Sequence, residues 1–403
     1  MFASKEKNVI GVDINKEAVA LINDGKIHIV EPGLDEMVQR AVSNDFLRAT
    51  TSAEPADAFI VAVPTPFVPL APEDSFPKPD LCYIKEAAKS ISKVLKSGDI
   101  VILESTVPVG ATEQMAEWLA EHRADLTFPH THGENSDIRI AHCPERVLPG
   151  QVIKELVQND RVIGGITKKC SDTAIDLYKI FVEGNFIITN SHTAEMAKLT
   201  ENASRDTGIA FANELSVVCD HLGINVWELI DIANKHPRVN ILQPGPGVGG
   251  HCIAVDPWFI VSKTPELTPL IRSARRVNDT KPNWVLKKVK IAITDLLQSN
   301  LNRKIVDVVI ACYGLTFKPD IDDLRESPAL KIAKNIGEFH GGRTLFVEPH
   351  ISELPFSMKD CELVETRTAL AEADIHLLLV DHEIFKDNKP LNGKIIDTRG
   401  IWS

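Results

Sequence analysis

The feature that most constrains the fold is a regular alternation of short apolar runs with longer amphipathic segments over the first 190 residues. The apolar runs have the length of buried strands, and the segments between them carry apolar residues at helical spacing. This alternation is typical of a parallel, doubly wound sheet, because each parallel strand needs a crossover connection, usually a helix. The expected strands are 9–13, 58–63, 100–104, 138–142, 161–164 and 186–189, and the clearest helices between them are 16–23, 84–95 and 112–121.

The pattern changes near residue 193, where strand signals give way to a long helical pattern that reaches residue 233 and resumes up to about residue 297. Strand signals then return at 305–313, 344–347, 375–380 and 394–397. A chain of 403 residues is also too long for one compact core. We therefore expect two Rossmann-like doubly wound α/β domains, residues 1–190 and 299–403, joined by a central all-α domain with a long helix, residues 191–298. The proline-rich stretch 64–79 is expected to be a surface loop.

Composition narrows the class of protein. The sequence has no run of roughly 18 apolar residues that could cross a bilayer, and its start lacks the apolar core of a secretory signal. The seven cysteines are scattered, with neither a CxxC pair nor zinc-ligand spacing, which favours reduced thiols and no bound metal. A net charge of −12 argues against a general nucleic-acid surface. We expect a cytoplasmic protein with neither membrane nor nucleic-acid partners.

The segment ending at Asp13 has the character of the second strand of a dinucleotide-binding unit. An acidic residue there accepts hydrogen bonds from ribose hydroxyls and favours NAD over NADP, although such an Asp is often only a helix cap. The glycine-rich phosphate loop normally lies about 20 residues upstream of that acid, and only 12 residues precede Asp13. We expect that the chain as given starts at an internal Met and lacks the first strand and glycine loop. The alternative is a degenerate cofactor domain in a non-enzymatic relative.

The most informative stretch is the loop 243–258, which has four glycines between Pro244 and His251 and then Cys252. Glycines permit backbone geometry that side chains forbid and allow a close approach. A cysteine between such a loop and a following helix is a candidate nucleophile, because exposed N–H groups there stabilise a thiolate. The alternative is a buried thiol that only fills space. Asp256 could orient a water or a base, or it could cap the next helix.

A second cluster lies on the long helical segment. Lys198, Asn202 and Arg205 recur at i, i+4 and i+7 and therefore share one face. Three hydrogen-bonding groups on one stripe suit the wall of an active site. The alternative is a solvated face, although Asn is a poor choice for the interior of an exposed helix.

Together these segments resemble the UDP-glucose/GDP-mannose dehydrogenase family, and the resemblance runs essentially end to end after the start. The helix with Lys198 and Asn202 carries part of it. The other segments that carry it are VPTP at 63–66, ESTVPVG at 104–110, CPERVLPG at 143–150, GGHC at 249–252 and GLTFKPDIDDLRESP at 314–328.

The resemblance implies a four-electron oxidation of the C6 alcohol of a nucleotide-linked hexose to a carboxylate, with two NAD. The Cys252 thiolate would hold the aldehyde as a thiohemiacetal, which is oxidised to a thioester and hydrolysed. Lys198 would stabilise oxyanion charge and assist proton transfer, with Asn202 and Asp256 in supporting positions. Glu145 matches an acid–base helper.

The resemblance also implies the binding residues. For NAD they are Asp13, Thr65, Thr106 and Arg325. For the UDP-sugar they are Lys198, Asn202 and the set Arg146, Val147, Arg205, His236, Arg238, Gly249, Phe317 and Lys318. Several of these have a local alternative: a charge at a helix end for His236 and Arg238, core packing for Phe317, and an ordinary turn or cap for Thr65 and Thr106.

The residue before Asp256 helps to assign a branch of the family. UDP-glucose enzymes commonly carry Lys there, whereas this chain has Val255, and with the segment 234–240 it resembles the branch that acts on UDP-N-acetylmannosamine. The alternatives are a UDP-glucose, UDP-N-acetylglucosamine or GDP-mannose dehydrogenase, or a catalytically silent nucleotide-sugar-binding relative. The resemblance further implies a homodimer formed through the central helices, in which Arg275 or Arg276 could reach a neighbouring subunit's substrate.

Overall fold

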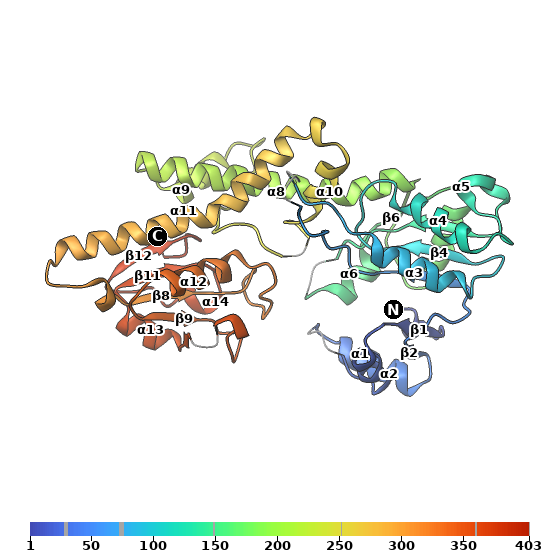
Figure 1. The fold of residues 1–403 in the computed structure, drawn as a ribbon, viewed down its shortest axis with the longest axis horizontal. Helices are drawn as coiled ribbons and strands as arrows, with labels where there is room; N and C mark the ends of the chain where they lie inside the picture. The colour runs from blue at the N-terminus through green and yellow to red at the C-terminus, as the bar shows by residue number, and fades with distance from the viewer. Residues whose placement is uncertain (28–30, 72–75, 148–149, 251, 359–360, 403) are drawn as a thin grey trace. The chain divides into compact units, whose positions relative to one another are not determined.

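The computed structural model describes residues 1–27, 31–71, 76–147, 150–250, 252–358 and 361–402. The chain separates into two compact units: unit 1 is Met1–Glu201 with Trp258–Thr264, and unit 2 is Asn202–Pro257 with Pro265–Ser403. The long helix α8 (Ser191–Leu222) begins in unit 1 and ends in unit 2. Each unit has a largely parallel sheet, and long helices dominate the middle of the chain (Figure 1), so the predicted α/β class with a helical centre is confirmed.

The main sheet of unit 1 has five strands in the order β3-β4-β5-β6-β7. Its strands are parallel except for the antiparallel pair β5–β6. The strands are β3 (Ala58–Val61), β4 (Ile100–Leu103), β5 (Arg139–His142), β6 (Arg161–Gly165) and β7 (Phe186–Asn190). The helices between them are α3 (Cys82–Ser92), α4 (Ala111–His122), α5 (Pro129–His132), α6 (Val152–Gln158) and α7 (Lys168–Tyr178), with a 3₁₀ turn at Gly133–Asn135.

Strand β4 shows why this sheet is covered on both faces. All four of its residues are buried apolar side chains, and successive side chains point to opposite faces. Val101 and Leu103 join the core formed with α3 and α4, whereas Ile100 and Ile102 join the core formed with α7. The continuous apolar run therefore indicates a central strand whose sheet is covered by helices on both faces.

The N-terminal part of unit 1 forms a separate two-stranded parallel sheet of β1 (Val9–Val12) and β2 (Leu47–Thr50). A 3₁₀ turn (Ala3–Lys5) precedes it, and α1 (Lys16–Asn23) and α2 (Leu34–Ser43) connect the two strands. The side chain of Asn15 accepts the N–H groups of Glu17 and Ala18 and so caps α1. The predicted alternative in which Asp13 is the cap is wrong: its carboxylate accepts the N–H of Asn15 at 2.8 Å.

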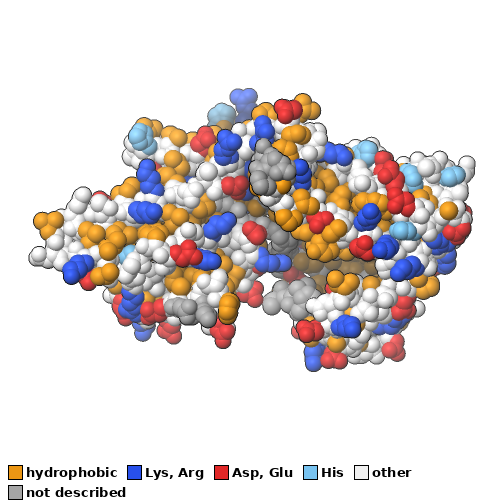
Figure 2. All heavy atoms as spheres, viewed as in Figure 1, with side chains coloured by type: hydrophobic (Ala, Val, Ile, Leu, Met, Phe, Trp, Pro, Cys, Tyr) orange, Lys and Arg blue, Asp and Glu red, His pale blue; other side chains and the backbone are white. Residues whose placement is uncertain are grey.

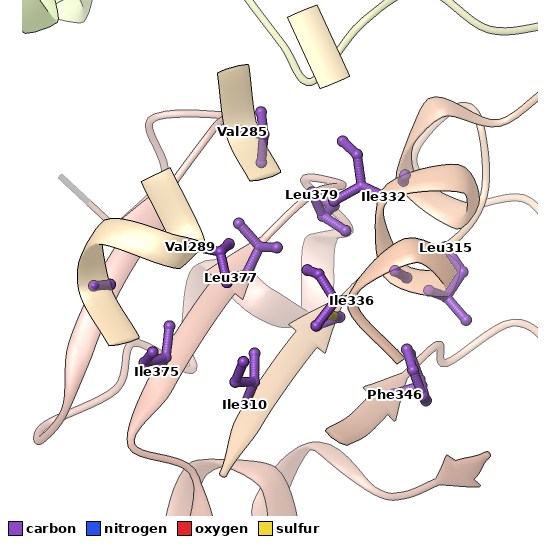
Figure 3. Close-up of a cluster of buried hydrophobic side chains, with 14 of the residues drawn as sticks. Val285, Val289, Ile310, Leu315, Ile332, Ile336, Phe346, Ile375, Leu377 and Leu379 are labelled. Atoms are coloured by element: carbon purple, nitrogen blue, oxygen red, sulfur yellow. The ribbon is translucent and has the colours of Figure 1, made fainter. Parts of the chain in front are cut away.

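Unit 2 contains a five-stranded parallel sheet in the order β10-β9-β8-β11-β12. Its strands are β8 (Ile310–Tyr313), β9 (Thr344–Val347), β10 (Glu362–Leu363), β11 (Ile375–Leu378) and β12 (Lys394–Asp397). The helices of this part are α12 (Pro328–Phe339), α13 (Thr366–Glu372) and α14 (Glu383–Lys386), with 3₁₀ turns at Ile305–Asp307 and Phe356–Met358. One face of the sheet packs on α11 and α12 through Val285, Val289, Ile332 and Ile336 (Figure 3).

The helical middle consists of α8, α9 (Val226–Ala233), α10 (Asp256–Lys263) and α11 (Pro269–Ser299), with a 3₁₀ turn at Pro265–Leu267. Within unit 2, α8 and α11 meet along a buried polar seam. Arg275 donates to the carboxylate of Asp206 at 2.6 Å, Asn213 and Asn278 are joined at 2.9 Å, and Lys281 donates to the hydroxyl of Ser216. Buried polar groups must find partners, so these pairs fix the register of the two helices.

Some sequence expectations need correction. The strand expected at 305–313 begins only at Ile310, because Ile305–Asp307 is a 3₁₀ turn closed by the side chain of Asp307. The short strands β2 and β10 were not predicted, since neither has a strong apolar run. Arg275 is buried and bonded to Asp206 and Asp279 of its own chain, so the expectation that it could reach a second subunit is wrong; Arg276 is exposed.

Two further observations concern the surface. Among the described residues, none of the helices is both long and apolar enough to cross a membrane. On the face seen in Figure 2, basic and acidic side chains are interspersed and not gathered into a basic tract.

Candidate active site

In unit 1, two predicted NAD contacts lie together in the loops that follow β3 and β4. The hydroxyl of Thr65 donates to the carbonyl of Thr106 at 2.7 Å, and the hydroxyl of Ser105 donates to the carbonyl of Val63 at 2.6 Å. These loops leave the carboxyl edge of the sheet, which is where open α/β sheets bind ligands. Thr65 therefore links two loops and does not cap a helix.

Glu195 on α8 anchors the loop after β4, a role that the sequence did not reveal. Its buried carboxylate accepts the N–H of Gly110 at 2.6 Å, the N–H of Thr112 at 2.7 Å and the hydroxyl of Thr112 at 2.6 Å. These bonds cap the first turn of α4. Burial raises the pKa of Glu195, and the hydrogen bonds oppose that rise. The predicted catalytic Lys198, one turn further along α8, is partly buried.

The loop after β5 carries Glu145, Arg146 and Val147, which line one small hollow of unit 1 together with Arg161. Arg146 forms an ion pair with Glu201 of α8 at 2.7 Å. Glu145 accepts the N–H of Arg146 at 2.6 Å and lies 3.5 Å from the guanidinium of Arg161. Three predicted site residues are therefore neighbours, and the ion pair holds their loop against α8.

Behind this hollow is a buried polar network that sequence reasoning missed. The hydroxyl of Tyr178 donates to Glu104 at 2.5 Å, and Arg161, itself only 6% exposed, lies 3.5 Å from the same carboxylate. Burial raises the pKa of Glu104, and it raises the pKa of the Cys143 thiol to about 11. Cys143 is thus an unreactive thiol. The sequence feature that could have indicated this network is Arg161, a charged residue at the first position of the otherwise apolar strand β6.

In unit 2, Cys252 lies in the turn that leads into α10. The N–H groups of Val255 and Asp256 both donate to the carbonyl of Cys252, at 3.0 and 2.9 Å. Asp256 is 2% exposed and its Oδ2 accepts the side-chain amide of Asn202 at 2.5 Å. Three of the predicted catalytic residues thus form one hydrogen-bonded group. Cys252 is partly buried, unlike the buried Cys143, Cys170, Cys219 and Cys312.

The glycine loop before Cys252 is held against the segment around Phe317. A Cβ on Gly249 would lie 2.6 Å from the carbonyl of Glu326 and 3.0 Å from the Cβ of Phe317, so only glycine fits there. Gly250 has φ +81°, and a Cβ on it would lie 3.2 Å from the Phe317 ring. The groups that approach Gly249 closely are therefore other residues of this chain, around Phe317 and Glu326.

Arg325 lies near Cys252. Its guanidinium donates to both oxygens of Asp323, and the shortest contact, to Oδ2, is 2.6 Å. The hydrogen bond to Asp323 is the main cause of a raised Arg325 pKa, and the charge of Cys252 adds to it.

The remaining predicted substrate contacts in unit 2 are exposed. Arg205 lies one turn after Asn202 on α8, Lys318 follows Phe317, and His236 and Arg238 lie just after α9. The N–H of Arg238 donates to Nδ1 of His236 at 3.3 Å, so these two share one turn. The structure therefore joins Thr65 with Thr106, Glu145 with Arg146, Cys252 with Asp256 and Asn202, and His236 with Arg238.

Comparisons with known proteins identify the family. Three sequence profiles of one family match in order: the NAD binding domain of the UDP-glucose/GDP-mannose dehydrogenase family at residues 1–182, its central domain at 192–280 and its UDP binding domain at 311–403. The chain belongs to the UDP-glucose/GDP-mannose dehydrogenase family, and it is an NAD-dependent nucleotide-sugar dehydrogenase.

Relatives cover the whole chain. It is 60% identical over 405 residues to UDP-N-acetyl-D-mannosamine dehydrogenase of Yersinia pestis, covering 100% of this chain and 95% of the relative. It is 59% identical over 406 residues to NDP-N-acetyl-D-galactosaminuronic acid dehydrogenase of Ralstonia nicotianae, covering 100% and 92%. Among solved structures, UDP-N-acetyl-mannosamine dehydrogenase of Staphylococcus aureus matches with a TM-score of 0.85 and 39% identity, covering 100% of this chain and 91% of that one.

The residues of unit 1 fit a bound NAD. Asp13 presents an exposed carboxylate directly after β1, which suits ribose hydroxyls. Thr65 and Thr106 are joined to each other at the carboxyl edge of the main sheet.

Proposed function

We propose that this chain oxidises the C6 alcohol of UDP-N-acetyl-D-mannosamine to the uronate, and that Cys252 is the covalent anchor. The observation that carries the proposal is the group formed by Cys252, Asp256 and Asn202, in which a partly buried thiol sits one turn before a carboxylate held by an amide. The 60% identity to an enzyme of that name over the entire chain supports the choice of sugar.

The thiol explains how an alcohol can become an acid without release of the aldehyde. The Cys252 thiolate adds to C6 of the aldehyde and gives a thiohemiacetal; oxidation gives a thioester, and water displaces the sulfur to give the carboxylate. NAD, when bound, accepts the hydride removed in each of the two oxidations. Asn202 keeps the Asp256 carboxylate beside the Cys252 turn, where it can hold a proton or orient water.

The remaining predicted residues serve in proton transfer, hydrolysis and NAD binding. Lys198, one turn before Asn202 on α8, stabilises negative charge on the C6 oxygen and assists proton transfer. Glu145, beside Arg161, serves as the acid–base helper for hydrolysis. Asp13, Thr65, Thr106 and Arg325 hold NAD.

The proposed nucleotide-sugar site adds cationic and polar groups to Lys198 and Asn202. Cationic, hydrogen-bonding side chains suit a diphosphate and a newly formed carboxylate. The remaining residues of this site are Arg146, Val147, Arg205, His236, Arg238, Gly249, Phe317 and Lys318.

A second candidate substrate is a nucleotide-linked N-acetylgalactosamine. It is favoured by the 59% identity to NDP-N-acetyl-D-galactosaminuronic acid dehydrogenase, which is nearly as high as the identity to the mannosamine enzyme. Both sugars carry a 2-acetamido group, and they differ in the configuration at C2 and C4.

A substrate panel tests the proposal. We expect UDP-N-acetylmannosamine to give two NADH per sugar, with kcat/KM at least about tenfold above UDP-N-acetylgalactosamine, UDP-N-acetylglucosamine, UDP-glucose and GDP-mannose. The reason is that polar groups of the site left unpaired by a wrong hydroxyl cost transition-state binding. NADH is followed by absorbance and the uronate by mass spectrometry. Preference for another sugar contradicts the choice of substrate, and binding without any NADH supports the silent relative.

We further propose that residues 1–190 bind NAD, residues 191–298 form the helical and dimerisation domain, and residues 299–403 bind the nucleotide. The bounds of the three matching family profiles support this division. The protein would act in the cytoplasm and supply a uronate for bacterial surface polysaccharide such as enterobacterial common antigen.

The proposed homodimer uses exposed apolar side chains on the central helices. Phe211, Val218 and Leu222 are 53%, 46% and 62% exposed and, being 7 and 11 residues apart, share one side of α8. Ile224, just before α9, and Ile232 on α9 are also exposed, at 48% and 64%. Contiguous exposed apolar side chains mark an interaction surface.

We expect the double substitution Phe211→Glu and Leu222→Glu to convert a dimer of about twice 44.4 kDa into a 44.4 kDa monomer, because it places desolvated charges in the interface. Light scattering after gel filtration measures the mass. Leu391→Glu is the control, since Leu391 is 95% exposed and lies outside the central helices. A doubly substituted chain that stays dimeric contradicts the proposed surface.

A further inference from the structure

Glu348 and His382 form a buried carboxylate–imidazole pair next to the turn that carries Phe317 and Lys318. Glu348 directly follows β9 and His382 follows β11, and these strands flank β8 on its two sides. Both side chains are fully shielded from solvent, and Nε2 of His382 lies 3.0 Å from Oε2 of Glu348. In an open α/β sheet this carboxyl edge, where the strand order reverses, is the place at which ligands bind.

Glu348 anchors the beginning of the turn. Its Oε2 accepts the N–H of Leu315 at 2.7 Å and the N–H of Thr316 at 3.2 Å. Burial alone would raise the pKa of Glu348, but the hydrogen bonds from His382 and from the backbone lower it below its ordinary value. An ionised carboxylate surrounded by donors is a strong anchor, because charge-assisted hydrogen bonds are stronger than neutral ones.

His382 anchors the end of the same turn. Its Nδ1 accepts the N–H of Asp320 at 2.9 Å. Asp320 has φ +59°, a left-handed conformation that a non-glycine residue adopts only when its surroundings impose it. Between the two anchors, the hydroxyl of Thr316 donates to the carbonyl of Lys318 at 2.9 Å and closes the turn.

The same histidine belongs to a cluster that could be mistaken for a metal site. Ligand atoms of Asp320, His350 and His382 lie within 4.8 Å of one another. A metal would need a lone pair on a ring nitrogen of His382. The lone pair of Nδ1 accepts a backbone N–H, so the ring proton is on Nε2, which donates a hydrogen bond to Glu348. Both ring nitrogens are engaged in holding the chain, so the geometry favours hydrogen bonding over cation binding.

We propose that Glu348 and His382 are positioning residues for the nucleotide: they fix the turn 315–320 so that Phe317 and Lys318 are already placed to receive a uridine diphosphate. This inference rests on the proposed function, which assigns those two residues to the nucleotide sugar. A turn ordered before binding loses less conformational freedom when the ligand arrives, which strengthens binding without a new contact.

The test is UDP binding to the full chain by calorimetry, well below the unfolding temperature of each variant. His382→Asn keeps an acceptor near Nδ1 and loses the donor to Glu348, whereas His382→Gln keeps a donor near Nε2 and loses the acceptor for Asp320. Glu348→Gln replaces an oxygen that accepts N–H groups by a donor. We expect the Kd for UDP to rise about tenfold in Glu348→Gln, the effect of one lost charge-assisted hydrogen bond, and by a smaller factor in each His382 variant.

His340→Asn is the matched control. His340 is also buried in unit 2, and its Nε2 bonds the carbonyl of Val308 at 2.7 Å, but Val308 precedes β8 at the amino edge of the sheet. We expect this variant to be destabilised and yet to bind UDP within about twofold of the parent.

Two results would overturn the inference, and a third would overturn the proposed function on which it rests. Parental UDP affinity in Glu348→Gln and in both His382 variants would show that the pair does not position the turn. If Glu348→Gln does not fold, the two His382 variants decide, because Glu348 keeps its backbone donors in them. An equal loss of affinity in His340→Asn would mean that general destabilisation is the cause. Failure of the parent chain to bind UDP would overturn the proposed function itself.

Discussion

Replacing Cys252 by Ala is expected to lower the rate of uronate formation by about 10³-fold or more, as expected when a nucleophile is removed. Alanine cannot add to the aldehyde, so the second oxidation loses its substrate. The turn itself should persist, since the N–H groups of Val255 and Asp256 donate to the carbonyl of residue 252, which alanine retains. Acid production is measured by mass spectrometry with the preferred sugar of the panel.

The control for Cys252→Ala is Cys82→Ala. Cys82 is the exposed cysteine at the start of α3, in the same chain but outside both groups of site residues. We expect Cys82→Ala to form the uronate at the parental rate. Undiminished acid formation by Cys252→Ala would remove the covalent mechanism, whatever the sugar.

Arg275→Met is expected to lower the free energy of unfolding by about 3–5 kcal/mol, because it leaves the buried carboxylate of Asp206 without its positively charged partner. Arg275 is 2% exposed and Asp206 is fully buried, so solvent does little to screen the pair. Burial already raises the pKa of Asp206 despite the facing guanidinium. The side-chain amide of Asn278 donates to the same carboxylate at 2.7 Å and cannot replace a full positive charge. Denaturant unfolding followed by circular dichroism gives the difference.

Two further variants test whether the loss of stability comes from the unpaired buried charge and not from the loss of a large side chain. Arg276→Met removes the exposed neighbour on the same helix and should change stability by less than about 0.5 kcal/mol. Removing both partners, Arg275→Met with Asp206→Leu, should restore much of the loss, because an apolar pair of similar volume leaves no charge buried alone. Parental stability of Arg275→Met would contradict the view that this seam holds α8 to α11.

Periodicity alone was enough to predict most of the sheet strands and the long helices. The runs 58–63, 100–104 and 186–189 correspond to β3, β4 and β7. The clearest of them is β4, which is apolar throughout because both of its faces are covered. Strands β2 and β10 were missed since their residues are mixed, and the register that pairs them comes from neighbours distant in the sequence. The strand expected at 305–313 was too long because a side-chain hydrogen bond from Asp307 favours a 3₁₀ turn at its start.

For the candidate site, too, the sequence determined some features and the tertiary structure determined the others. Sequence determined the chemistry that is available: a thiol after a glycine loop, and Lys198 and Asn202 one helical turn apart, since helix spacing is a local property. Only the tertiary structure decided that Asn202 holds Asp256, that Glu195 caps α4, and that Glu348 and His382 hold one turn from two different strands. These hydrogen-bonded partners are 33 to 83 residues apart in the chain, and no periodicity links them. Buried polar groups must be paired, but which group pairs with which is fixed by how the strands and helices pack.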